Sequence, residues 1–143
     1  MTGTQLMDGL LAAHGGRERW QRVERIDASL SSGGLAFTTH CQPFALRDLH
    51  ISVAPHRREV VLRNYCRPGW RGVWTPQRVE IRDDGDALVA ERQNPRASFG
   101  RLVKQVRWDK LDILYFAGYA LWNYLSFPFI LETSGVSVRG LEA

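Results

Sequence analysis

Cysteine is scarce in this chain of 143 residues, which limits the ways in which the fold can be stabilised. The two cysteines, Cys41 and Cys66, lie too far apart in the sequence for a CxxC metal or redox motif. Residues 1–13 contain no basic leader followed by an apolar core, so a cytoplasmic location is expected. Because the cytoplasm is reducing, we predict two buried free thiols and treat a disulfide between them as the less favoured alternative.

Histidine is also rare, and no pattern typical of an enzyme or of a metal site is present. The four histidines lack ligand spacings such as HxxxH and HExxH, so we expect no metal ion and no other cofactor. His40 and Cys41 are adjacent, and in a strand their side chains would point to opposite faces and could not form a catalytic dyad. The sequence therefore predicts a protein that is not an enzyme and has no catalytic residues.

Two short motifs could bind ions but are better explained as turns. The Ser-Gly-Gly segment at 32–34 is too short for a phosphate loop and is expected to join two strands, without a helix N-terminus beside it. The acidic residues at 83–86, together with Glu80, are expected at the solvated tip of a hairpin. Weak calcium binding there is the alternative, although the spacing differs from that of an EF-hand loop.

Lysine is nearly absent, since arginine supplies all but two of the 19 basic residues, and the formal net charge is +4. Residues 57–107 contain twice as many basic as acidic residues. Apart from the adjacent pair at 57–58, these arginines are spaced singly, and they never form the run of about five to eight basic residues that is typical of a nucleic-acid site. We therefore expect them on the solvated face of a sheet, with no nucleic-acid partner.

The hydrophobic pattern that is present predicts one α+β domain. Its expected parts are a helical start at 1–23, an antiparallel β-meander at 24–93, a connection at 94–107, an aromatic helix at 108–131 and a tail at 132–143 with a strand-like segment at 136–139. A twisted antiparallel sheet of this size curls into a half-open β-barrel. We expect the long aromatic helix to lie against its concave face.

The first 23 residues predict a bent pair of helices. Thr4 is the expected N-cap of the first helix, and the glycines at 15–16 should end it. The second helix would carry Trp20 and Val23 inward. The positions expected to form the buried face of the first helix are Leu6, Met7, Leu10, Leu11 and His14, the last at the helix end, where it favours the helix dipole.

Alternation of apolar and polar residues predicts seven or eight strands. The alternating segments are 26–30, 35–37, 46–53, 59–65, 70–75, 78–82 and 87–92. No helical segment is expected between them, so the sheet must be antiparallel. The Asp-Gly pair within residues 83–86 predicts a tight hairpin turn.

Residues 111–131 form the most apolar stretch of the chain, with a single charge at Asp112. A helix that is apolar all round must be buried in protein, in a membrane or against an apolar ligand. Asp109 and Asp112 have the spacing of a capping box, Pro128 should end or kink the helix, and Gly118 predicts a close contact with a neighbouring element. Polar residues within the stretch and aromatic rings scattered through its middle argue against a membrane span.

Two segments carry a resemblance to a known family. Residues 13–34 contain Ala-His-Gly-Gly, then Trp20, Val23, Ile26 and a Gly-Gly pair at 33–34, and residues 114–125 read LYFAGYALWNYL, followed by Pro128 and Phe129. These segments resemble the lipoprotein-localisation-factor (LolA/LolB-like) superfamily and a bacterial group associated with it. The resemblance implies a half-open barrel capped by helices, with a hydrophobic cavity for acyl chains. This chain has no lipobox cysteine or secretion signal and is shorter, so it would be a truncated or compact version.

We therefore predict a non-enzymatic binding or carrier protein for a lipid or other hydrophobic small molecule. The alternative is a protein-interaction module, such as a homodimer, that uses the sheet edge and the apolar helix and binds no small molecule. Aromatic residues line cavities and fill cores with similar frequency, so core packing is an equal alternative for each predicted ligand contact. The predicted ligand-binding residues are Tyr115, Phe116, Tyr119, Trp122, Phe37 and Trp74.

Overall fold

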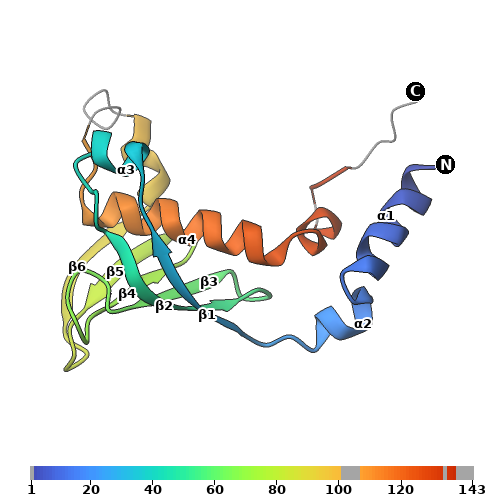
Figure 1. Ribbon diagram of the computed structural model, residues 1–143, viewed down its shortest axis with the longest axis horizontal. Helices are drawn as coiled ribbons and strands as arrows, with labels where there is room; N and C mark the ends of the chain where they lie inside the picture. Colours follow the sequence, from blue (N-terminus) through green and yellow to red (C-terminus); the bar gives the residue numbers. More distant parts are fainter. Residues whose placement is uncertain (1, 101–106, 134, 138–143) are drawn as a thin grey trace.

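The computed structural model describes residues 2–100, 107–133 and 135–137, which form an α+β fold around one open antiparallel sheet (Figure 1). The six strands lie in the sheet in the order in which they occur in the sequence. They are β1 (Ile26–Ser32), β2 (Leu46–Ala54), β3 (Glu59–Arg63), β4 (Arg71–Trp74), β5 (Arg78–Arg82) and β6 (Leu88–Gln93). The predicted α+β class and antiparallel meander are confirmed, and the sheet does not close on itself.

The sheet has fewer strands than predicted because residues 35–37 are helical. Helix α3 (Leu35–Thr39) replaces the expected second strand. The hydroxyls of Thr38 and Thr39 donate to the carbonyls of Gly34 and Ala36, so the local backbone groups are satisfied without a neighbouring strand. Leu35 points to solvent, which shows that the short alternation here reflects no buried sheet face.

Strands β2 to β5 have the inward and outward faces that alternation predicts, whereas the edge strands β1 and β6 have no fully buried residue. Leu49, Ile51 and Val53 of β2 are buried, whereas His50 between them is exposed. Val79 and Ile81 of β5 are buried in the same way. Residues 83–87 turn the chain between β5 and β6, where the Ala87 amide donates to Asp83.

Helices α1 (Gly3–Ala13) and α2 (Gly16–Gln21) project beyond one end of the sheet (Figure 1). Thr2, not Thr4, is the N-cap of α1, because it forms a reciprocal capping box with Gln5. The predicted buried face is also wrong, since only Leu11 is buried and Leu6 is exposed. His14 caps the C-terminus of α1, and its Nδ1 donates to the Leu10 carbonyl over 2.8 Å.

Few contacts hold this helical pair to the rest of the molecule. The Trp20 ring of α2 stacks on Phe129, with ring centroids 4.5 Å apart, and His56 contacts the Trp20 carbonyl at 3.1 Å. Arg17 forms ion pairs with Glu132 at 2.6 Å and with Asp8 at 2.8 Å. The N-terminal helices are therefore anchored through α2 to the segment that follows the long helix.

The long helix α4 (Lys110–Ser126) begins at the predicted cap. Asp109 and Asp112 form the capping box, each accepting from the backbone amide of the other. The helix is shorter than predicted and ends at Ser126, because Pro128 has no amide to continue it. The Phe127–Pro128 bond is cis, and the 3₁₀ helix η3 (Phe129–Glu132) follows.

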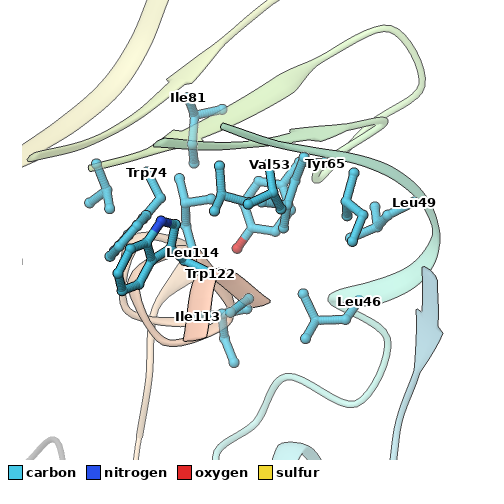
Figure 2. Packing of buried hydrophobic residues seen from close by; sticks show 14 residues of the cluster. Leu46, Leu49, Val53, Tyr65, Trp74, Ile81, Ile113, Leu114 and Trp122 are labelled. Atoms are coloured by element: carbon cyan, nitrogen blue, oxygen red, sulfur yellow. The ribbon is translucent and has the colours of Figure 1, made fainter. Parts of the chain in front are cut away.

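Helix α4 packs across one face of the sheet and fills the space beside it (Figure 2). In Figure 2, Ile113, Leu114 and Trp122 of the helix face Val53, Trp74 and other buried side chains of the sheet. The predicted close contact at Gly118 is confirmed, because a Cβ atom there would lie 2.2 Å from Cγ of Trp74. A Cβ at Gly72 would likewise lie 2.6 Å from Cδ1 of Leu114.

A buried ion pair fixes the first turn of α4 against β6. Asp112 is fully buried and accepts from Arg92 at 2.7 Å and from the Ser98 hydroxyl at 2.9 Å. Arg92 also pairs with Asp109 at 2.8 Å. The hydrogen bond that Arg92 donates to Asp109 raises the pKa of the Arg92 guanidinium. Strand β6 and the helix start are thus joined through a buried carboxylate and a partly buried guanidinium.

The remaining predicted segments are only partly within the described residues. Residues 95–100 form the 3₁₀ helix η1 (Pro95–Gly100), and the rest of the predicted connection up to residue 106 lies outside the described residues. Val136 and Ser137 are not in a strand, whereas 138–139 of the expected strand-like tail lie outside the description. Among the described residues, no helix has the length and apolar character needed to cross a bilayer.

The contact between Gly118 and Trp74 predicts an unusual response to alanine. Gly118→Ala should lower the free energy of unfolding by about 1–3 kcal/mol, because overpacking outweighs the better helix propensity of alanine. Gly9→Ala in α1 is the matched control, since nothing lies within 4 Å of its new Cβ. Urea denaturation should show the control unchanged or stabilised; equal destabilisation of the two variants would contradict the close contact.

The ion pair at the start of α4 predicts a second stability difference. Asp112→Ala should lower the free energy of unfolding by about 3–5 kcal/mol, because it leaves a partly buried guanidinium without its closest partner and removes the N3 half of the capping box. Asp27→Ala removes an exposed carboxylate that pairs with Arg25 and is hydrogen-bonded to Ser52, and it should lower the free energy of unfolding by less than about 1 kcal/mol. An Asp112 variant as stable as the Asp27 variant would show that the buried pair does not hold α4.

Candidate functional site

The six predicted ligand-binding residues fall into two groups on opposite sides of α4. Trp74 and Trp122 are 1% and 8% exposed and belong to the core between the helix and the sheet. The indole nitrogen of Trp122 donates to the Pro55 carbonyl over 3.0 Å, which satisfies its polar atom inside the protein. Trp74 is therefore a packing residue. Trp122 also packs in the core, although it lines a separate open pocket of about 310 Å³ together with Trp20 and Phe129.

The other four predicted residues lie together on the solvent side of α4. Phe116 and Tyr119 are 40% and 54% exposed, and Tyr115 is half-buried. Phe37 of α3 contacts Phe116 edge to face, with ring centroids 6.3 Å apart. Tyr115 and Tyr119 are one helical turn apart, and their ring centroids are also 6.3 Å apart.

An open groove of about 380 Å³ follows this side of the helix. We call it the aromatic groove and define it by Arg96, Phe99, Trp108, Tyr115, Phe116 and Tyr119. Trp108 lies at its centre, since the ring contacts Phe116 at 5.2 Å and Phe99 at 5.5 Å between centroids. These rings form edge-to-face and tilted pairs, arrangements that leave parts of the aromatic surfaces uncovered.

Three residues of the groove were missed by reasoning from the sequence. Phe99 and Arg96 belong to η1, which has no apolar periodicity, so no sequence signal places them beside α4. Trp108 was identifiable as an aromatic residue directly before a helix cap, but its contacts depend on the fold. His40 supports Trp108 from behind, because the two rings stack in parallel with centroids 4.1 Å apart.

The electrostatics of the groove combine apolar walls with one positive charge. Burial raises the pKa of the Tyr115 hydroxyl, and the nearby charge of Arg96 partly opposes that shift. Arg96 is exposed and, within the part of the chain that the structure describes, forms no ion pair. The groove can therefore offer apolar contact along its length and a guanidinium at one edge.

The cysteines, His40 and the Ser-Gly-Gly segment lie outside the aromatic groove, in turns or at the ends of helices and strands. Cys41 and Cys66 are free thiols, but Cys41 is exposed, which corrects the prediction of two buried thiols. His40 and Cys41 lie at the end of α3 and not in a strand, because the segment turns after a helix. The Ser-Gly-Gly segment leads into α3 and not into a strand, so the prediction that it joins two strands was wrong. Helix α3 has only 5 residues.

Two of the acidic residues near the β5–β6 turn are paired with arginines. Asp86 forms ion pairs with Arg71 and Arg82, and Glu80 pairs with Arg78 and Arg82. The hydrogen bond from Arg82 lowers the pKa of Glu80, with further contributions from the positive charges beside it. Among the described residues, no three His, Cys, Asp or Glu side chains lie close enough together to hold a metal ion.

No protein-family model, curated protein or solved structure matches this chain. The resemblance of residues 13–34 and 114–129 to the lipoprotein-localisation superfamily therefore stays a prediction. On the chain's own surface, the aromatic groove combines exposed rings, a concave shape and one positive charge, and it is therefore the candidate site.

The two sides of α4 predict opposite consequences for stability. Trp122→Ala should lower the free energy of unfolding by about 3–5 kcal/mol, because it removes a buried ring and leaves the Pro55 carbonyl unpaired. Tyr119→Ala, three residues earlier on the exposed side, should change it by less than about 1 kcal/mol. Urea denaturation of both variants tests this assignment, and comparable losses would place Tyr119 in the core as well.

Proposed function

We propose that this protein is a non-enzymatic binding or carrier protein for a hydrophobic ligand, a lipid or an acyl chain, and that the ligand lies in the aromatic groove. The observation that carries the proposal is the side-by-side exposure of Phe116 and Tyr119 in a concave surface walled by further rings. Its volume of about 380 Å³ falls within the range of about 300–1,000 Å³ that is usual for small-molecule sites.

The aromatic groove lies elsewhere than the half-barrel cavity, between the helix and the sheet, in which the ligand was first expected. Trp74, Trp122 and the Gly118 backbone occupy that space closely, so a guest there would have to displace core side chains. The half-open barrel implied by the family resemblance remains part of the proposal, and the open six-stranded sheet with α4 across one face supports it. The cytoplasmic location also remains a prediction.

Binding would require burial and no chemistry. Each methylene removed from water contributes about 0.8 kcal/mol, so a chain of several methylenes laid over the rings could bind in the micromolar range. Arg96 lines the groove, where its guanidinium could donate hydrogen bonds to the carboxylate of a fatty acid. The favoured ligand is therefore an acyl chain with an acidic head group.

A second candidate is a homodimer or other protein interaction without a small molecule. The exposed apolar side chains outside the groove favour it, especially Leu88 and Val89 at the edge strand β6 and Tyr124 and Phe127 at the end of α4. An edge strand offers unpaired backbone groups to a partner. The two candidates differ in what a concentration series shows.

Titration with a fluorescent fatty acid tests the proposal. We expect saturable binding that Phe116→Ala and Tyr119→Ala each weaken at least tenfold, because each removes an apolar wall. Tyr124→Ala is the matched control, since this tyrosine is on the same helix and 76% exposed but does not line the groove. Arg96→Gln should weaken a fatty acid more than the corresponding fatty alcohol.

The same samples distinguish the second candidate. Absence of saturable binding, or an equal effect of Tyr124→Ala, would contradict the carrier proposal. Analytical ultracentrifugation that shows a dimer down to low protein concentration, together with no fatty-acid binding, would favour the interaction module.

A further inference from the structure

A second concave site lies at the end of the molecule where α4 begins, opposite the end that carries α1 and α2 (Figure 1). It is an open pocket of about 500 Å³, larger than the aromatic groove. The start of β2, the turn between β3 and β4 and the first residue of α4 form its walls. The lining residues that matter here are Phe44, Arg47, Tyr65, Cys66, Arg67 and Lys110, and we call this the basic pocket.

Three cationic side chains line the basic pocket, against one carboxylate. Arg47, Arg67 and Lys110 come from three separate parts of the sequence, and Asp48 is the acidic member of the lining. Within the described residues none of the three cations forms an ion pair, whereas Arg71, Arg78 and Arg82 of the sheet are paired with carboxylates. The pocket thus concentrates positive charge that the described part of the protein does not neutralise.

Hydrogen bonds hold the walls of the pocket in place. The Tyr65 hydroxyl is buried and donates to the Lys110 carbonyl over 2.6 Å, which joins the β3–β4 turn to the start of α4. Across the turn, the Tyr65 amide donates to Trp70, whose amide donates to Arg67, both over 3.2 Å. Arg67 and Lys110 are therefore carried by backbone segments that these hydrogen bonds hold in place.

The two guanidinium groups are also positioned by aromatic rings. Arg47 lies over the Phe44 ring at 4.5 Å, and Arg67 lies over the Trp70 ring at 4.9 Å. Stacking of this kind restricts a flexible side chain while its hydrogen-bond donors stay available to an anion. Preorganised donors lose less entropy when a ligand binds.

The Cys66 thiol reports the charges that meet in this pocket. Burial raises the pKa of the thiol, and the positive charges of Lys110 and Arg67 oppose the shift. Both cations therefore act at the same point although they are distant in the sequence. Cys66 also has a left-handed backbone with φ of 67°, uncommon for a residue of its kind, which places it in the tight turn at the pocket wall.

We propose that the basic pocket binds a small organic phosphate, in which a phosphomonoester is carried by an aromatic body. Two arginine forks and one lysine suit the several oxygens of a phosphate dianion. The pocket is much larger than a single phosphate, which leaves room for an organic part. Phe44 is 65% exposed, and the face of its ring that Arg47 does not cover offers a flat apolar surface on which an aromatic group can stack.

This site goes beyond the proposed carrier function and shares no residue with the aromatic groove. A titration can therefore show phosphate binding without fatty-acid binding, or fatty-acid binding without phosphate binding. Each result bears on one site alone.

Calorimetric titration with adenosine 5′-monophosphate, adenosine and inorganic phosphate tests the proposal. We expect saturable binding of the monophosphate, at least tenfold tighter than of either part alone. Arg47→Gln and Arg67→Gln should each weaken it at least tenfold, because each removes one charged fork. Arg57→Gln is the matched control, since it removes the same charge from an exposed arginine outside the pocket and should have no effect.

Three outcomes would overturn the inference. The first is absence of saturable binding of the monophosphate. The second is equal weakening by Arg57→Gln, which would indicate only diffuse charge attraction. The third is binding of inorganic phosphate as tight as that of the nucleotide. The third outcome would show that the organic part makes no contact.

The two cysteines provide an independent readout of location. Saturating adenosine 5′-monophosphate should slow alkylation of Cys66 by iodoacetamide at least threefold and leave the exposed Cys41 unaffected, as followed by mass spectrometry of the separate peptides. Cys41 does not line the pocket and serves as the internal control in the same tube. Equal protection of both thiols, or of neither, would contradict occupancy of the basic pocket.

Discussion

The close approach of the α4 backbone to the sheet is the constraint on which the rest of the structure depends. At Gly118 and Gly72 the two layers are so close that a methyl group on either glycine would overlap a core side chain. Such closeness leaves room for Trp74 and Trp122 on the sheet side but not for every ring of this aromatic helix. The remaining rings, including Phe116 and Tyr119, are therefore turned to the outside, where they form a surface instead of a core.

Much of this architecture could be predicted from local chemistry. The capping box of Asp109 and Asp112, the role of Gly118 and the inward face of β2 all depend on residues near one another in the sequence. The division of the aromatic residues could not be predicted, because α4 is apolar on nearly every side and its pattern marks no single buried stripe. Only the position of the sheet decides which rings are covered.

Two errors have a different cause. Leu35 and Phe37 alternate as strand residues do, but two apolar positions are too few to specify a partner strand, and local hydrogen bonds favour α3. The grouping of Arg47 and Arg67 in one pocket could not be predicted either, because they are far apart in the sequence. Folding brings Arg47 and Arg67 to one pocket from different strand ends, which no linear pattern of basic residues could reveal.

The strictly sequential order of the strands has a consequence for how the chain acquires its structure. Each of the five strand pairings joins neighbours in the sequence, so the sheet can assemble by successive short closures. Helix α4, however, follows all six strands in the chain and packs against β2 to β6. During synthesis from the N-terminus the meander therefore leaves the ribosome before its cover exists. Until residues 110–126 emerge, Val53, Val60 and Val79 form an uncovered apolar face, and this interval is the period in which the nascent chain is most exposed to aggregation or to capture by a chaperone.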